Sequence, residues 1–146
     1  MNRREANKTL ALAALGSSFA LETALAQTAA VKAIKLVDLD KIDAKWKPLE
    51  FTFENRACLL QRVAVPKEKT ERALVVEKEA FSAVSRRCTH AGCQTELPKT
   101  DGVHYCDCHG SEFDGLGLVK AGPARSPLTA VKLEVREKAI WAVAFL

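Results

Sequence analysis

Two short boxes rich in cysteine and histidine dominate this sequence: Cys88-Thr89-His90-Ala91-Gly92-Cys93 and Cys106-Asp107-Cys108-His109-Gly110-Ser111. Four of the five cysteines and all three histidines of the 146-residue chain lie between Cys88 and His109. Each box offers a thiol and an imidazole that a tight loop can direct at one point. The fifteen residues between His90 and Cys106 are enough for an out-and-back hairpin that brings the boxes together. The spacing therefore predicts a metal site with four ligands: Cys88, His90, Cys106 and His109.

Two kinds of metal centre use two cysteines and two histidines. One is a structural zinc site. The other is a [2Fe–2S] cluster with both thiolates on one iron and both imidazoles on the other. The two further cysteines, Cys93 and Cys108, have no role in a simple zinc site, whereas in an exported domain they can pair with each other. The residues alone favour the cluster and leave zinc as an alternative.

The pattern C-T-H-x-G-C followed by C-x-C-H-G-S resembles the two signature boxes of Rieske iron–sulfur proteins of the disulfide-containing branch. The resemblance spans about residues 51–143, and it implies one Rieske [2Fe–2S] cluster per chain. Cys88 and Cys106 would bind one iron, and His90 and His109 the other. The resemblance also implies a disulfide between Cys93 and Cys108.

The same resemblance implies which neighbouring residues adjust the cluster: Ser111, Phe113, Gly92, Gly110 and Pro123. In the family, a serine at the position of Ser111 donates a hydrogen bond to a cluster sulfide, and a tyrosine two residues later donates to a cysteine sulfur. This chain has Phe113 in place of that tyrosine. Because both hydrogen bonds favour the reduced cluster, we expect a reduction potential below that of tyrosine-bearing relatives. Pro123 lies where the family has a loop that covers the cluster.

Among Rieske proteins, the chain is most similar to the small subunit of arsenite oxidase-type molybdoenzymes, through its leader, the segment 51–60 and Phe113. This resemblance implies a large molybdopterin-containing catalytic subunit as partner, and a c-type cytochrome or cupredoxin as electron acceptor. The alternatives are the Rieske subunit of a cytochrome bc-type quinol-oxidising complex and a free-standing periplasmic carrier. Cytochrome bc subunits carry a large apolar residue where this chain has Ala91.

The first 26 residues have the features of an export signal. Arg3 and Arg4 precede a short apolar run from residue 10 to 21, and Ala24-Leu25-Ala26 supplies a small-x-small cleavage site. Adjacent arginines are typical of the twin-arginine route. We therefore expect a signal peptide over 1–26, a periplasmic Rieske domain over 27–146, and no membrane association unless the leader is retained.

The rest of the chain predicts an all-β fold, because apolar and β-branched residues recur in short runs separated by turn residues. The expected strands are 33–37, 49–53, 58–65, 74–76, 81–84, 103–105, 131–135 and 140–145, with one or two helical turns over 38–45. We expect a small antiparallel sandwich or barrel with a cluster-binding loop subdomain at about 85–126. Trp46, Trp141 and Phe145 are expected in the core or at its rim.

Composition and the remaining residues exclude several functions. The chain is 48% hydrophobic and 27% charged with a net charge of +4, which is typical of one globular domain and too little positive charge for a nucleic-acid interface. Catalysis by this chain alone is not expected. A Rieske oxygenase needs a second iron site with two histidines and a carboxylate, and only His104 remains, which we expect on the exposed side of a strand. Cys58 is interpreted as a small buried hydrophobe.

Overall fold

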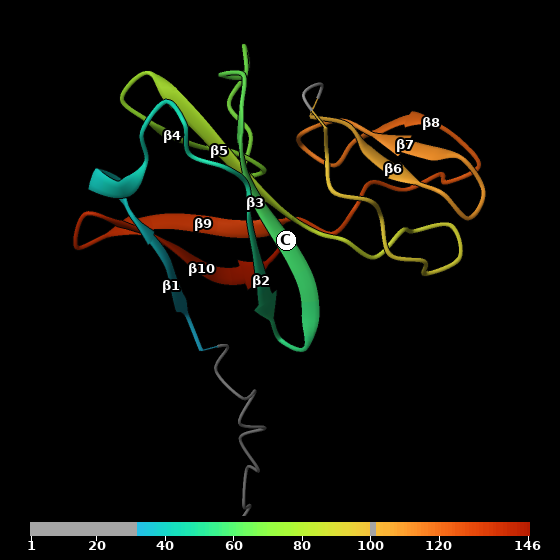
Figure 1. Cartoon of the computed structure of the whole chain (residues 1–146), viewed down its shortest axis with the longest axis horizontal. Helices are drawn as coiled ribbons and strands as arrows, with labels where there is room; N and C mark the ends of the chain where they lie inside the picture. The colour runs from blue at the N-terminus through green and yellow to red at the C-terminus, as the bar shows by residue number, and fades with distance from the viewer. Residues whose placement is uncertain (1–31, 100–101) are drawn as a thin grey trace, which may run out of the picture.

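The computed structural model describes residues 32–99 and 102–146, which fold into three antiparallel β-sheets (Figure 1). The predicted signal peptide lies outside the described residues. The described strands are β1 (Ile34–Asp38), β2 (Leu49–Phe53), β3 (Arg56–Val63), β4 (Leu74–Val76), β5 (Glu79–Ser85), β6 (His104–Cys106), β7 (Ser111–Phe113), β8 (Val119–Ala121), β9 (Val131–Arg136) and β10 (Ala139–Phe145). The expectation of an all-β antiparallel fold is confirmed.

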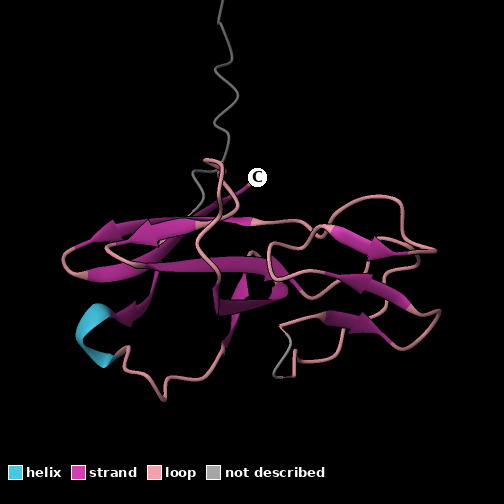
Figure 2. Ribbon diagram, turned by 90° about the horizontal axis from the view of Figure 1, so that it is seen from above, coloured by secondary structure: helices cyan, strands magenta, loops and turns pink. Residues whose placement is uncertain are grey.

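Two of the sheets pack face to face and form the base of the molecule. Their strand orders are β1-β10-β9 and β2-β3-β5-β4, and Figure 2 shows them as stacked layers beside the smaller third sheet. Side chains from both sheets share one hydrophobic core, which includes Phe53, Leu60, Phe81, Leu133 and Ile140. Burying this apolar surface is the main driving force that holds the two sheets together.

Local sequence explains why the base strands form where they do. The alternating run Leu49–Phe53 turns its apolar residues inward and leaves Glu50 and Thr52 exposed. Glu54 and Asn55 follow with φ angles of 44° and 61°, so that Phe53 pairs with Arg56 across a two-residue hairpin. Asparagine tolerates this left-handed conformation better than most residues, which is why such pairs occur in tight hairpins.

The third sheet, β6-β7-β8, forms a separate lobe between β5 and β9. The chain leaves the base after Ser85 and returns at Ala130, which forms an isolated bridge with Val84. This lobe is on the right of Figure 1. The second box connects β6 to β7, and the first box lies between β5 and β6 in the chain.

The structure differs from the sequence-based expectations at three places. Strands β7 and β8 were not expected, since these three-residue strands show no periodic signal and, unlike Leu74–Val76, contain no apolar run. Only a 3₁₀ turn over Leu39–Lys41 forms within the helical segment expected at 38–45. His104 is completely buried, so the prediction of an exposed strand residue was wrong.

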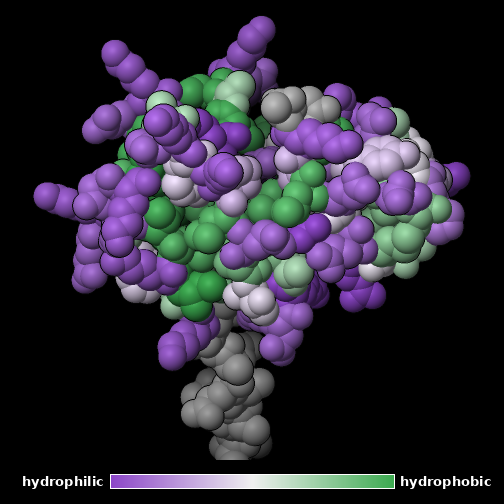
Figure 3. All heavy atoms as spheres, viewed as in Figure 1, coloured by the Kyte–Doolittle hydropathy of each residue, from purple (hydrophilic) through white to green (hydrophobic). Residues whose placement is uncertain are grey.

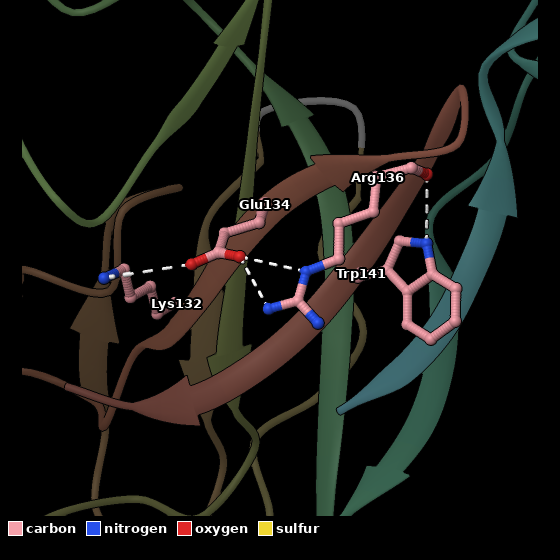
Figure 4. Close-up of polar contacts among 4 residues, drawn as sticks. All are labelled: Lys132, Glu134, Arg136 and Trp141. Atoms are coloured by element: carbon pink, nitrogen blue, oxygen red, sulfur yellow. Dashed lines mark hydrogen bonds and ion pairs between the residues drawn. The ribbon is translucent and has the colours of Figure 1, made fainter. Parts of the chain in front are cut away.

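Hydrophilic side chains cover much of the face seen in Figure 3, around a band of apolar residues. On the exposed side of β9, Glu134 lies between Lys132 and Arg136, at 4.0 and 2.7 Å (Figure 4). The Trp141 indole N–H donates to the Arg136 carbonyl at 3.1 Å. Such exposed ion pairs contribute little to stability. Within the described residues, no helix has the length and apolar character to cross a membrane.

Candidate metal centre

The two boxes form loops that are closed in the same way. In the first box, the Gly92 N–H donates to the Cys88 carbonyl at 2.9 Å, and in the second, the Gly110 N–H donates to the Cys106 carbonyl at 2.9 Å. Both glycines have positive φ angles, 79° and 78°, a conformation that costs other residues free energy. Each loop therefore turns back sharply, four residues after the cysteine that begins it.

The two box cysteines that are not disulfide-bonded lie together in the interior. Cys88 and Cys106 are 2% and 1% exposed and belong to one apolar cluster with Phe113, Leu128 and Ala130. Burial, followed by contact with the Cys88 thiol, raises the pKa of Cys106. A bound metal ion favours the deprotonated thiolate instead of the thiol. Its positive charge offsets the free-energy cost of burying the negative charge of the thiolate.

The two histidines of the boxes lie together at the surface. The His90 and His109 rings are both exposed, and their centroids are 4.7 Å apart with the ring planes at 79°. The four predicted ligands thus form a buried pair of thiols and an exposed pair of imidazoles. This division matches a cluster whose two irons take different ligands better than a single zinc ion.

A disulfide joins the boxes beside these residues. Cys93 and Cys108 are bonded to each other, with their Cα atoms 6.6 Å apart. The Cys106 sulfur lies within 4.8 Å of both disulfide sulfurs. Because Cys93 and Cys108 carry no free thiol, they do not compete as ligands, and their bond holds the two loops at a fixed separation.

A third loop, which contains Pro123, is hydrogen-bonded to both boxes. The Ala124 N–H donates to the Ser111 hydroxyl oxygen at 3.0 Å, and the Thr89 hydroxyl donates to the Ser126 carbonyl at 2.6 Å. The loop that contains the exposed Pro123 is therefore held by one residue of each box. Since the Ser111 oxygen accepts from Ala124, its own proton is free to be donated elsewhere. The role of Thr89 was not predicted, because its partner is 37 residues away.

Phe113 lies fully buried in the same apolar cluster as the two thiols. Ser111 is also fully buried, on the same strand β7. Two of the five residues predicted to adjust the cluster therefore lie on one strand: Ser111 pairs with Cys106 across the sheet, and Phe113 packs in the cluster that contains both thiols.

Two further titratable residues lie in the interior away from the ligand pairs. His104 contacts the Gln61 amide nitrogen at 2.9 Å, and that amide also donates to the Gly115 carbonyl at 2.9 Å. Burial lowers the pKa of His104 to about 4, so the ring is neutral at physiological pH. Burial raises the pKa of the Cys58 thiol, in the core of the base, to about 11.

Comparison with known proteins shows to which family this chain belongs. Residues 47–133, more than half of the chain, match the family model described as the Rieske [2Fe-2S] domain. The chain belongs to the Rieske [2Fe-2S] domain family. The cofactor of this family is a [2Fe–2S] cluster, and the paired thiols and imidazoles are the donor types that such a cluster requires.

The relatives come from several kinds of protein. The chain is 40% identical over 58 residues to the cytochrome b6-f complex iron-sulfur subunit 2 of Nostoc sp., covering 40% of this chain and 33% of that subunit. It is equally identical over 58 residues to carotenoid phi-ring synthase of Chlorobaculum tepidum, covering 40% of this chain and 9% of the synthase. The chain thus spans about a third or less of these two relatives.

A solved structure agrees with the fold. The plasma membrane Rieske protein PetC3 from Synechocystis PCC 6803 superposes with a TM-score of 0.54 at 26% identity, covering 77% of this chain and 98% of that one. The likeness to a Rieske protein therefore extends from the boxes to the sheets that carry them.

Proposed function

We propose that this Rieske domain carries single electrons through a cluster held by Cys88 and Cys106 on one iron and by His90 and His109 on the other. The observation that carries the proposal is the division of these residues into a buried thiol pair and an exposed imidazole pair. When bound, the cluster supplies a one-electron couple. The buried thiols would hold their iron away from water, while the exposed imidazoles would present the other iron's ligands to a partner protein.

Pulsed EPR on the reduced protein tests the ligand assignment. We expect a rhombic signal with an average g value below that of the free electron and nitrogen couplings from two imidazoles. His109→Asn should abolish the two-nitrogen spectrum or the cluster itself. His104→Asn is the matched control and should leave both couplings. Persistence of two couplings in the His109 variant would disprove the assignment, and a zinc protein would give no signal in any variant.

We further propose that the chain acts as the Rieske subunit of a cytochrome bc-type quinol-oxidising complex. Support comes from several relatives that are named as iron-sulfur subunits of cytochrome b6-f complexes. The arsenite oxidase-type molybdoenzyme that the sequence favours is the second candidate. Its specific support is Phe113, which fills the buried position after the second box.

Purification from the native host without disruption of complexes separates these candidates. Co-elution of the Rieske EPR signal with a b-type cytochrome supports the first assembly, and co-elution with molybdenum supports the second. Elution of the signal with this chain alone would reject both and leave a free-standing carrier.

Export by the twin-arginine route to the periplasm completes the proposal. Its support is the sequence from Arg3 to Ala26 and the Cys93–Cys108 disulfide, which suits an oxidising compartment. Replacing Arg3 and Arg4 with lysine should leave the protein in the cytoplasm, as cell fractionation would reveal. Unchanged export of this double variant would rule out the twin-arginine route.

A further inference from the structure

A pocket of about 280 Å³ opens beside the first box, and arginines line much of it. Its walls include the guanidinium-bearing residues Arg56, Arg86 and Arg87 together with Asn55, Gly92 and Gln94. These residues come from the β2–β3 turn and the start of β3, from the two positions that follow β5, and from the end of the first box and the residue after it. Gly92 also closes the first box, and the electron-transfer site described above uses none of the others.

Backbone hydrogen bonds hold the walls of this arginine pocket in place. The Arg86 N–H donates to the Ala57 carbonyl at 2.8 Å, and the Thr95 N–H donates to the Arg86 carbonyl at 2.7 Å. Arg87 and Gln94 form an isolated antiparallel bridge. The pocket is therefore part of the framework that supports the first box.

The charges in the pocket are not balanced. Arg86 is 7% exposed, pairs with Glu50 and donates to the Thr95 carbonyl at 2.6 Å, so its charge is partly neutralised. Arg56 lies over the Phe145 ring at 4.9 Å. Within the described residues, neither Arg56 nor Arg87 forms an ion pair. Among the described residues, Glu50 is thus the one carboxylate that pairs with any of these three guanidinium groups.

Arg87 connects the pocket to the electron-transfer site. Its Nε atom lies 3.2 Å from the position that a Cβ atom on Gly92 would occupy, so the guanidinium covers the turn that closes the first box. Gly92 is two residues after the exposed His90, and Arg87 immediately precedes Cys88. A negative group bound here would therefore lie beside the surface through which the proposed electron transfer takes place.

We infer that the arginine pocket binds a carboxylate side chain of the protein that exchanges electrons with the cluster. This inference rests on the proposed function. Planar guanidinium groups bind carboxylates through paired, charge-assisted hydrogen bonds. The Asn55 and Gln94 amides offer further donors. Because a redox partner has to approach the exposed imidazoles, a carboxylate on that partner is the anion brought to this position, and opposite charge accelerates such transient encounters.

Oxidation of the reduced full-length holoprotein by small reagents tests the charge of the pocket. Each hexacyanoferrate(III) anion, or each tris(phenanthroline)cobalt(III) cation, accepts one electron from one reduced cluster. We expect Arg87→Gln to slow oxidation by the anion about threefold to tenfold at low ionic strength and not to slow oxidation by the cation. Arg136→Gln removes the same charge at the far end of β9 and serves as the control (Figure 4).

A carboxylate probe separates the proposed ligand from free phosphate. At matched ionic strength, hexaglutamate should compete with hexacyanoferrate for the wild-type protein and shift the NMR signal of the Asn55 side-chain amide. Both effects should be lost in the Arg56→Gln/Arg87→Gln variant. Competition by phosphate but not hexaglutamate, or an equal rate loss in Arg136→Gln, would overturn the inference. A missing Rieske EPR signal in the wild type would instead reject the proposed function.

Discussion

Phe113 lies beside the thiol pair, and its side chain brings no hydrogen-bond donor. It is fully buried in the apolar cluster that contains Cys88 and Cys106. Phe113→Tyr adds a hydroxyl for which a ligand sulfur is the expected acceptor, and this bond favours the more negative, reduced cluster. We expect the reduction potential to rise by tens of millivolts, at about 40 mV for each kcal/mol of hydrogen-bond energy. An EPR-monitored redox titration measures the shift.

Ser111→Ala is the opposite test and should lower the potential, because the proton that Ser111 leaves free would be lost. A Phe113→Tyr variant with an unchanged or lower potential would contradict the interpretation of this strand.

Cys58 is an unreactive thiol in the base. Burial raises its pKa from 9.0 to about 11, so at pH 8 its thiolate fraction is about 100-fold lower than that of an ordinary cysteine. In the folded holoprotein, we expect iodoacetamide to label it very slowly, with a rate that rises about tenfold per pH unit up to pH 10. Mass spectrometry of digests measures this labelling.

The same pKa shift affects stability, with a definite sign. The unfolded chain loses the Cys58 proton near pH 9 and the folded chain near pH 11, so the unfolding free energy falls as pH rises through this interval. Cys58→Ala removes this slope and should leave the EPR spectrum unchanged. Rapid labelling of Cys58 at pH 8, or the same slope in the alanine variant, would show that burial does not control this thiol.

At the scale of the elements, the disulfide and the proposed cluster connect the same two loops. Cys93 and Cys108 are 15 residues apart, and closing a loop of this length contributes about 3 kcal/mol by restricting the unfolded chain. A bound cluster also connects the boxes, so part of this contribution is redundant in the holoprotein. We therefore expect Cys93→Ser/Cys108→Ser to lower the unfolding free energy more in the apoprotein than in the holoprotein, as denaturant titrations measure. An equal loss in both forms would disprove this redundancy.

The sequence predicts the base elements better than the lobe that carries the site. Strands β2 and β4 form at the expected residues, because Leu49–Phe53 alternates and Leu74–Val76 is a compact apolar run. Strands β7 and β8 are too short for a periodic pattern and form by pairing with their neighbours. The family resemblance supplied the disulfide pairing, whereas the bonds from Thr89 and Ala124 to the third loop depend on contacts between distant residues.

At the scale of the whole molecule, a buried polar network attaches the lobe to the base. Gln61 of β3 contacts His104 of β6, and the Gly115 carbonyl accepts from Gln61 and from the Ser82 hydroxyl, at 2.9 and 2.6 Å. Arg72 adds hydrogen bonds to the Leu116 and Leu128 carbonyls, both at 3.0 Å. Sequence patterns could not predict the burial of His104, because Gln61 is 43 residues away.

The Gln61 side-chain amide of the base contacts two residues of the lobe, His104 and Gly115. Gln61→Ala leaves the buried His104 ring without this partner, and it leaves Gly115 with Ser82 alone. The unsatisfied His104 nitrogen costs about 1–3 kcal/mol and the lost bond to Gly115 about 1 kcal/mol, so we expect a loss of about 2–4 kcal/mol and a clearly lower Tm. Ser82→Ala is the matched control and should cost about 1 kcal/mol, because Gln61 still donates to Gly115. In both variants, the EPR spectrum should persist below the melting temperature, since neither residue belongs to the boxes. If Gln61→Ala is no more destabilising than Ser82→Ala, hydrophobic packing rather than this polar network holds the lobe to the base.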